Sequence, residues 1–257
     1  MRYSIRLSYD GAAFCGWQIQ PNAPSVQECL ETALSKLLRE DIKVTGAGRT
    51  DTRVSAINYV AHFDTSNDPG IDANTICYKL NAILPLSIKV HEVKPEADSF
   101  HARFGATKRG YRYFINRRKD PFVTGMSFFY SFPLDVEAMN RAAQHLLGTH
   151  DFHCFEKVGS DNKTSVCTVF SAHWDSWTPT HVRELGFPAE EGDYLVFTIQ
   201  ADRFLRNMVR AVVGSLLEVG RGKRKPEWIS ELISGGTRSD AGESVPGHAL
   251  FLNEIKY

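Results

Sequence analysis

Apolar and polar residues alternate along several short segments of the chain, and this alternation predicts strands that bury one face. The clearest example is the N-terminal segment, where Tyr3, Ile5, Leu7 and Tyr9 are separated by polar neighbours. Similar patterns of apolar and polar residues predict further strands over residues 56–63, 88–93, 111–115, 128–132, 166–174, 194–200 and 249–257.

Apolar residues at helical spacing predict helices between these strands. Ser25, with Glu28 three residues later, forms a capping box before the first helix. The apolar stripe of that helix consists of Val26, Leu30, Ala33, Leu34, Leu37 and Leu38. The pattern predicts further helices over residues 72–84, which stops before Pro85, and over 135–148, 208–220 and 228–233.

The two halves of the chain carry similar mixtures of strands and helices, which predicts an α+β fold built on a duplicated unit. No sequence repeat is strong enough to prove the duplication. We expect the boundary near residues 100–106. Because no low-complexity linker lies there, we expect the halves to share a continuous sheet or a tight interface.

The composition is that of a globular protein, with 42% hydrophobic and 23% charged residues. No stretch approaches the roughly 18 uncharged apolar residues of a membrane span. The alternating N-terminus differs from a signal peptide. The cysteines number 5, are widely spread and form no CxxC pair, which favours reduced thiols. We therefore expect a cytoplasmic protein without membrane contact.

The chain carries 30 basic and 30 acidic residues, so its net charge gives no sign of a nucleic-acid partner. Such a partner would require segregated surface charge. The candidate basic stretches are Lys108, Arg109, Arg112, Arg117, Arg118 and Lys119; Arg203, Arg206 and Arg210; and Arg221, Lys223, Arg224 and Lys225. Taken singly, such a stretch is more often a solvated face than a track for phosphates.

The most unusual local sequence is Gly46-Ala47-Gly48-Arg49-Thr50-Asp51, a glycine-rich loop between two predicted strands. It lacks the lysine and the spacing of a P-loop and is not GxGxxG, which argues against a nucleotide-cradling role. A plain surface turn is the simpler interpretation, because Gly and Asp are ordinary turn residues. The functional alternative is an ionised carboxylate at Asp51 that acts as a covalent nucleophile, with Arg49 or Arg210 favouring the charged form.

A pair of tyrosines offers a second candidate for function. Tyr111 and Tyr113 share one face of a predicted strand, while Arg112 points to the other face. Aromatic rings beside positive charge suit stacking on an unpaired base. Core tyrosines with solvated arginines are the alternative.

One cluster invites a metal hypothesis. It consists of His150, Asp151, His153 and Cys154. It follows a predicted helix end, and no second cluster stands at a recognisable ligand spacing. We therefore expect no metal.

At this point the residues converge on one family, because the chain resembles the TruA-type tRNA pseudouridine synthases from end to end. The resemblance rests on the order and spacing of several motifs. The matching segments are Tyr9-Asp10-Gly11, Phe14-Cys15-Gly16-Trp17-Gln18, Ser25-Val26-Gln27, Gly46-Ala47-Gly48-Arg49-Thr50-Asp51, Phe100-His101-Ala102-Arg103-Phe104, Tyr111-Arg112-Tyr113, Met208-Val209-Arg210 with Gly214, and Leu250 before Tyr257.

The resemblance implies a fold of two ferredoxin-like halves, residues 1–104 and 105–257, whose sheets join around a central RNA-binding cleft. It implies a homodimer that grips one tRNA with both subunits and uses no cofactor. It also implies the reaction, which is the isomerisation of uridine to pseudouridine at positions 38 to 40 of the anticodon stem-loop.

The resemblance also assigns roles to single residues. Asp51 matches the nucleophile, Arg49 is its neighbour in the motif, and Arg210 matches the partner of the carboxylate. Tyr111 matches the ring that stacks on the target base, and Leu250 matches a wall of the pocket.

The implied mechanism begins with a base that leaves its stack, because the carboxylate cannot otherwise reach it. Asp51 then attacks C1′ of the ribose or C6 of the uracil, or it abstracts the C2′ proton. The sequence favours none of these routes. The base detaches, turns and reattaches through C5, and C5 must then lose its proton, for which Tyr111 is a candidate base.

The chain departs from the family after Asp51, where it reads Thr52-Arg53-Val54-Ser55-Ala56 and the family usually ends in Gly-Val-His-Ala. Arg53 thus replaces a glycine, and Ser55 replaces a histidine. If the position of Arg53 requires a positive φ, the turn is strained by about 1 kcal/mol and Asp51 is displaced. Alternatively, Arg53 adds a phosphate contact to the substrate.

Two other classes of protein remain alternatives. One is a non-catalytic protein that binds and remodels tRNA, which the pair Arg49 and Asp51 with Tyr111 argues against and Arg53 slightly favours. The other is a glycoside hydrolase, which normally uses two catalytic acids. No partner motif for Asp51 is visible in the sequence.

Overall fold

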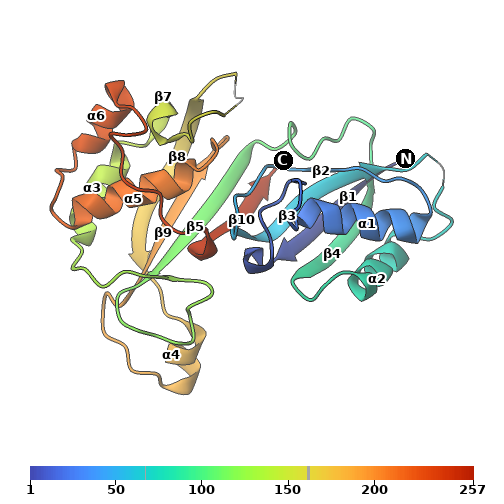
Figure 1. Ribbon diagram of the computed structural model, residues 1–257, viewed down its shortest axis with the longest axis horizontal. Coiled ribbons are helices and arrows are strands. Elements are labelled where there is room, and N and C mark those ends of the chain that lie inside the picture. Colours follow the sequence, from blue (N-terminus) through green and yellow to red (C-terminus); the bar gives the residue numbers. More distant parts are fainter. Residues whose placement is uncertain (67, 161–162) are drawn as a thin grey trace. The chain divides into compact units, whose positions relative to one another are not determined.

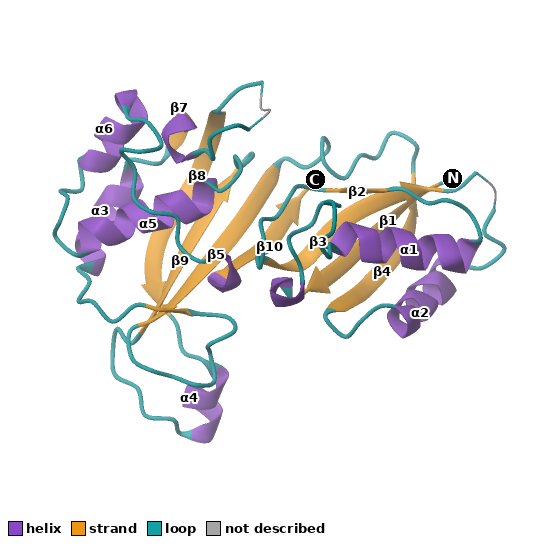
Figure 2. Cartoon of the chain, viewed as in Figure 1, coloured by secondary structure: helices purple, strands orange, loops and turns teal. Residues whose placement is uncertain are grey.

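The computed structural model of the chain describes residues 1–66, 68–160 and 163–257. The chain forms two compact units, Met1–Lys108 with Phe251–Tyr257, and Arg109–Leu250 (Figure 1). Each unit combines a sheet with helices, as Figure 2 shows, so the predicted α+β class is confirmed. Within the described residues, no helix combines the length and apolar character needed to cross a bilayer.

The first unit contains strands in the order β4-β1-β3-β10, with β2 beside β3. The strands are β1 (Arg2–Tyr9), β2 (Val44–Gly46), β3 (Ser55–Asp64), β4 (Ile88–Glu96) and β10 (Leu250–Lys256). β1 is antiparallel to both of its neighbours, whereas β10 runs parallel to β3, with Phe251 opposite Ser55. The helices α1 (Val26–Leu38) and α2 (Ala73–Ile83) lie side by side over this sheet (Figure 1).

Local sequence explains where these two helices begin and end. The Ser25 hydroxyl accepts a hydrogen bond from the Glu28 backbone N–H at 3.3 Å, as the capping box predicts. The Asp72 carboxylate caps α2 in the same way. α2 ends where Leu84 turns extended, because a residue before proline is pushed out of the helical region.

The second unit contains strands in the order β5-β9-β8-β7, with β6 parallel to β5. The strands are β5 (Lys108–Asn116), β6 (Phe128–Phe129), β7 (Gly148–Asp151), β8 (Val166–Ser176) and β9 (Tyr194–Ala201). The helices are α3 (Val136–Gln144), α4 (Thr180–Leu185), α5 (Met208–Gly220) and α6 (Trp228–Gly235). α3 packs against α5, α6 and β8, and in α5 every residue except Arg210 and Glu218 is buried.

Two predicted elements differ from the structure. The helix predicted to reach Gly148 ends at Gln144, because the next residues form shorter turns and Gly148, with a φ of 96°, begins β7. The strand predicted through Phe132 is wrong beyond Phe129, since β6 pairs only with the last two residues of β5. The pattern also missed the short elements β2, β7 and α4.

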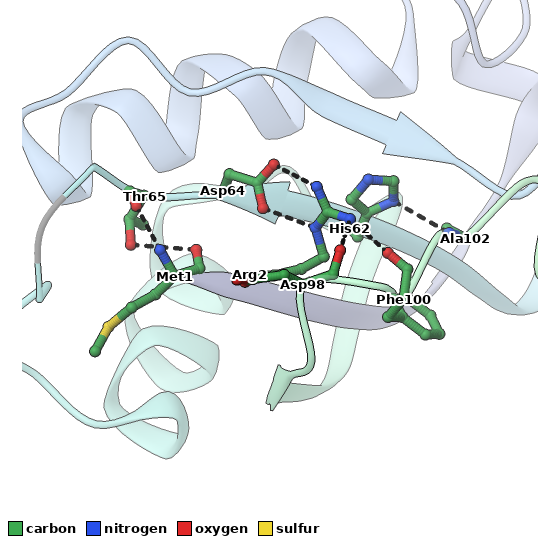
Figure 3. A network of polar contacts seen from close by, with 8 residues as sticks. All are labelled: Met1, Arg2, His62, Asp64, Thr65, Asp98, Phe100 and Ala102. Carbon is green, nitrogen blue, oxygen red and sulfur yellow. Dashed lines mark hydrogen bonds and ion pairs between the residues drawn. The ribbon is translucent and has the colours of Figure 1, made fainter.

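A polar network at the start of β1 fixes the segment that carries the Phe100 to Phe104 motif (Figure 3). Arg2 donates two hydrogen bonds of 2.8 Å to the Asp64 carboxylate. Its third nitrogen donates to the carbonyl oxygens of Asp98 at 2.6 Å and Phe100 at 2.7 Å. The guanidinium therefore anchors the connection that follows β4 to the strands β1 and β3.

His62 of β3 completes this network (Figure 3). Its Nδ1 accepts a hydrogen bond from the Ala102 backbone N–H at 3.2 Å. Burial, followed by the positive charge of Arg2, lowers the pKa of His62 to about 4. The ring is therefore neutral near pH 7 and can act as the acceptor.

Candidate active site

The loop that carries Asp51 lies between β2 and β3 of the first unit. It begins alongside β3, where the Ala47 N–H donates to the Val60 carbonyl at 2.9 Å. The Val54 N–H donates to the Asp51 carbonyl at 3.1 Å, which closes a β-turn. Arg53, the third residue of this turn, has a φ of 65°. A positive φ at this position is typical of a type II turn and favours glycine, so the predicted condition for strain at Arg53 is met.

Two glycines of the segment after β1 pack directly on the Asp51 turn. A Cβ added at Gly11 would lie 2.3 Å from the Val54 carbonyl oxygen. One added at Gly16, which has a φ of 101°, would lie 2.5 Å from the Thr50 carbonyl oxygen. No residue with a side chain fits at either place, so the backbone contact itself explains these two motif glycines.

Backbone hydrogen bonds tie the same segment to both sides of Asp51. The Trp17 N–H donates to the Thr50 carbonyl at 3.2 Å. The Arg53 N–H donates to the Phe14 carbonyl, also at 3.2 Å. The residues before and after Asp51 are therefore held by one neighbouring segment, which fixes the path of the loop.

Ser55, which stands where the family usually has histidine, is part of this support. Its hydroxyl accepts a hydrogen bond from the Gly11 backbone N–H at 3.0 Å, and the side chain is buried. The buried N–H of Gly11 is thereby satisfied, so the substitution keeps a hydrogen-bonding side chain under the loop.

Aromatic side chains form the floor of the loop. The hydroxyl groups of Tyr9 and Thr50 lie 2.8 Å apart. The rings of Trp17 and Tyr59 pack against each other with centroids 4.3 Å apart and planes tilted by 31°, and Trp17 is buried. The Tyr59 hydroxyl donates to the Gly48 carbonyl and accepts from the Gly48 N–H at 3.2 Å. This floor limits the conformations open to the loop.

The charged side chains of the loop lie on its outer side. Thr50 points inward and is buried, while Arg49 is exposed and Asp51 is half-buried. Arg53 is exposed as well. The structure thus places Arg49, Asp51 and Arg53 in one loop, with the half-buried Asp51 between two exposed arginines along the chain.

Arg210 belongs to the second unit, in the first turn of α5. Its Nε donates to the Val245 carbonyl at 2.7 Å, and the Val245 N–H donates to the Arg210 carbonyl at 3.2 Å. Leu250, which is buried, follows five residues after Val245. Because Arg210 and Asp51 lie in different units, their pairing stays a prediction.

Tyr111 lies on β5 in the second unit. Its side chain is only 9% exposed, and its ring meets that of Phe204 edge to face at 5.0 Å. Tyr113 is fully buried on the same face, while Arg112 is exposed, so the predicted alternation along this strand is confirmed. Stacking of Tyr111 on a base stays a prediction.

Tyr113 serves the structure of the second unit. Its hydroxyl donates to the Pro246 carbonyl at 3.0 Å. Burial raises the pKa of Tyr113 far above its usual value, so the phenol stays protonated. Arg210 and Tyr113 together hold the segment that leads from Val245 to Leu250.

Within the cluster His150, Asp151, His153 and Cys154, the His153 Nδ1 lies 3.3 Å from the Asp151 carboxylate. Among the described residues, no group of three or more His, Cys, Asp or Glu side chains stands at metal-binding distance. Burial raises the pKa of the Cys154 thiol to about 12. Asp151 instead accepts hydrogen bonds from the Ser165 hydroxyl at 2.5 Å and the His153 N–H at 3.0 Å.

The chain belongs to the tRNA pseudouridine synthase family, whose profile matches residues 7–105 and 142–257. It is therefore an isomerase that acts on uridine in tRNA. This confirms the family and the enzyme class that the motifs predict, and it excludes the glycoside hydrolase alternative.

Two relatives are both named tRNA pseudouridine synthase A. The protein of Bacteroides fragilis is 47% identical over 260 residues, which cover 100% of this chain and 96% of the relative. The protein of Bacteroides thetaiotaomicron is 46% identical over 256 residues, which cover 100% of this chain and 90% of the relative. Among solved structures, a Cbf5-Nop10-Gar1 complex gives a TM-score of 0.38 at 10% identity, over 97% of this chain and 48% of that one. That likeness is too low to carry an argument.

Sequence reasoning missed the residues that support the loop. Tyr9, Thr50, Tyr59 and Ser55 received no role, although they form its floor and its hydrogen bonds. Gly11 and Gly16 could have indicated this support from the sequence, because a glycine often marks a place where two backbone segments approach closely.

Proposed function

We propose that the chain converts uridine to pseudouridine at positions 38 to 40 of the tRNA anticodon stem-loop, with the Asp51 carboxylate as nucleophile. The main observation behind the proposal is that the backbone around Asp51 is held in place by the segment after β1. Backbone hydrogen bonds at Thr50 and Arg53 hold the chain on both sides of Asp51, and Asp51 itself is half-buried. A nucleophile held in this way loses little freedom when it attacks.

The loop also suits the approach of a flipped nucleotide. A base leaves its stack at the lowest cost near an unpaired loop, and the anticodon stem-loop provides such a place. The exposed guanidinium groups of Arg49 and Arg53 can contact phosphates on either side of the reacting nucleotide. Attack at C1′ or at C6 and abstraction of the C2′ proton all require the carboxylate at this position.

The first test is chemical mapping of pseudouridine in unmodified anticodon stem-loop transcripts, each with a single uridine at 38, 39 or 40. The wild type should form product without added cofactor, and Asp51→Asn should form none while it still binds the RNA. Asp41→Asn is the matched control, because this carboxylate is exposed and pairs with Lys43. Product from Asp51→Asn would refute the nucleophile, and no product at any of the three positions would refute the assignment to the anticodon stem-loop.

A second test addresses Tyr111 and Arg210. If Tyr111 removes the C5 proton, Tyr111→Phe should abolish turnover, whereas a ring that only stacks should survive this change. If Arg210 pairs with Asp51, the effects of Arg210→Gln and Asp51→Asn on substrate binding should not add. Additive effects would refute the pairing.

We further propose that the protein acts as a homodimer, which the family resemblance implies, and that it works in the cytoplasm, which the composition and the alternating N-terminus favour. Light scattering of the purified protein with and without tRNA measures the mass directly. A monomer that binds one tRNA at full activity would contradict the dimer. Cell fractionation tests the location.

A further inference from the structure

The third basic stretch of the sequence forms the turn between α5 and α6, residues 221–225, which we call the basic turn. Its backbone is fixed by hydrogen bonds to the end of α5. The Arg221 N–H donates to the Leu217 carbonyl at 3.0 Å, and the Gly222 N–H donates to the Val219 carbonyl at 2.8 Å. Gly222 has a φ of 72°, the conformation that ends helices.

Two arginines of the basic turn are stacked on aromatic rings. The Arg221 guanidinium lies 3.8 Å from the Phe132 ring centroid. The Arg224 guanidinium lies 4.9 Å from the Trp228 ring centroid. Stacking fixes the plane of a guanidinium and leaves its N–H edge for a second partner, such as a phosphate. Less side-chain freedom is then lost when that partner binds.

Ion pairs involve cations of both the first basic stretch and the basic turn. In the first basic stretch, Lys108 pairs with Glu254 at 3.4 Å and Arg118 pairs with Glu190 at 3.0 Å. In the basic turn, Lys223 pairs with Glu218. Across the described residues, the remaining cations of the turn form no ion pair; they are Arg221, Arg224 and Lys225.

We infer that the basic turn binds phosphates of the tRNA backbone. This rests on the proposed function for the identity of the RNA. The turn follows the last residue of α5, ten residues after Arg210, which corresponds to about 15 Å along the helix. Guanidinium edges and ammonium groups match phosphate oxygens, and the resulting contacts carry no sequence preference.

A structural explanation competes with this inference. Cations after the last turn of α5 also complement the partial negative charge at a helix C-terminus. That role would change the stability of the protein and would leave RNA binding unaffected. The two explanations therefore predict different measurements.

The experiment compares two triple variants in tRNA binding between 50 and 200 mM salt. The test variant is Lys223→Gln with Arg224→Gln and Lys225→Gln. The control variant is Lys36→Gln with Lys79→Gln and Lys89→Gln, which removes the same charge from exposed positions on α1, α2 and β4. For the test variant, the slope of log Kd against log salt should fall by about 2 to 3, since each lost phosphate contact lowers it by about 0.9. KM for tRNA should rise while kcat is unchanged.

Several outcomes would overturn the inference. Equal slope changes in both variants would mean that only net charge matters. An unchanged slope with a lowered melting temperature would support the helix-end role. Lys225→Glu provides a second variant, because no described residue forms an ion pair with Lys225, and it should weaken binding without unfolding the chain. If the wild type binds tRNA through this turn but forms no pseudouridine at positions 38 to 40, the proposed function fails while the inference stands.

Discussion

The hydroxyl groups of Tyr9 and Thr50 lie 2.8 Å apart, and both side chains are buried. Tyr9 is the last residue of β1, and Thr50 immediately precedes Asp51. The hydrogen bond therefore ties the end of a central strand to the residue next to the candidate nucleophile. Because Tyr9 belongs to the sheet, this hydrogen bond restricts the position of the loop.

We expect Tyr9→Phe and Thr50→Val each to lower the free energy of unfolding by about 1–2 kcal/mol, because each leaves a buried hydroxyl without this partner. The double variant should cost less than the sum of the two, by about 1 kcal/mol. Urea denaturation of all four proteins measures this coupling. Strictly additive losses would mean that the pair does not act together.

The two glycines of the Gly46 to Gly48 segment should respond differently to alanine. A Cβ at Gly46 would lie 2.2 Å from the Tyr59 hydroxyl and 2.6 Å from the Trp17 ring, whereas none of the atoms around Gly48 lies within 4 Å of an added Cβ. Gly46→Ala should therefore destabilise the protein by about 1–3 kcal/mol through overpacking. Gly48→Ala should fold normally and serves as the control. Equal stabilities would disprove this account of the loop floor.

Arg53→Gly tests whether the strained backbone or the guanidinium matters more. Arg53 has a φ of 65°, and glycine at this conformation should raise the free energy of unfolding by about 0.5–1 kcal/mol. Arg39, which ends α1 with a φ of 56°, provides the matched variant Arg39→Gly. Both changes should stabilise the protein to a similar degree.

Activity then separates the two interpretations of Arg53. If its side chain contacts a phosphate, Arg53→Gly should raise KM for tRNA and reduce the salt dependence of binding, while Arg39→Gly should not. If strain alone displaces Asp51, Arg53→Gly should raise kcat. Steady-state kinetics at two salt concentrations decides between these outcomes.

His62 should make the stability depend on pH below neutrality. Its pKa falls from 6.5 to about 4 on folding, chiefly through burial, with Arg2 and His101 acting in the same direction and Asp64 against them. Between these values the unfolded chain binds more protons, so stability rises with pH and is lost as the pH falls from 6.5 to 4. The full effect is about 3 kcal/mol.

Urea denaturation of the wild type and of His62→Gln at pH 4.5 and pH 7 measures this dependence. Glutamine can still accept the hydrogen bond from the Ala102 N–H (Figure 3), but it does not titrate. The variant should therefore lose much of the wild-type difference between the two pH values. An identical difference in both proteins would place the acid sensitivity elsewhere.

Local patterns in the sequence determined most of the secondary structure. The alternation at Tyr3 to Tyr9, the cap at Ser25 and the stop before Pro85 all depend on near neighbours in the chain, and the structure confirms each of them. The loop at Gly46 to Asp51 was also visible, because its composition is unusual. These features need no knowledge of distant contacts.

Only the tertiary structure decided what supports that loop and where the last strand pairs. Gly11 and Ser55 are far apart in sequence, yet their hydrogen bond lies beneath Asp51. β10 joins β3 of the first unit, a parallel pairing that no local pattern encodes. The ion pair between Arg118 and Glu190 likewise joins residues that are far apart in the sequence. The physical reason is common to all three, since backbone packing, strand pairing and charge neutralisation depend on which segments meet, and periodicity along the chain does not specify that.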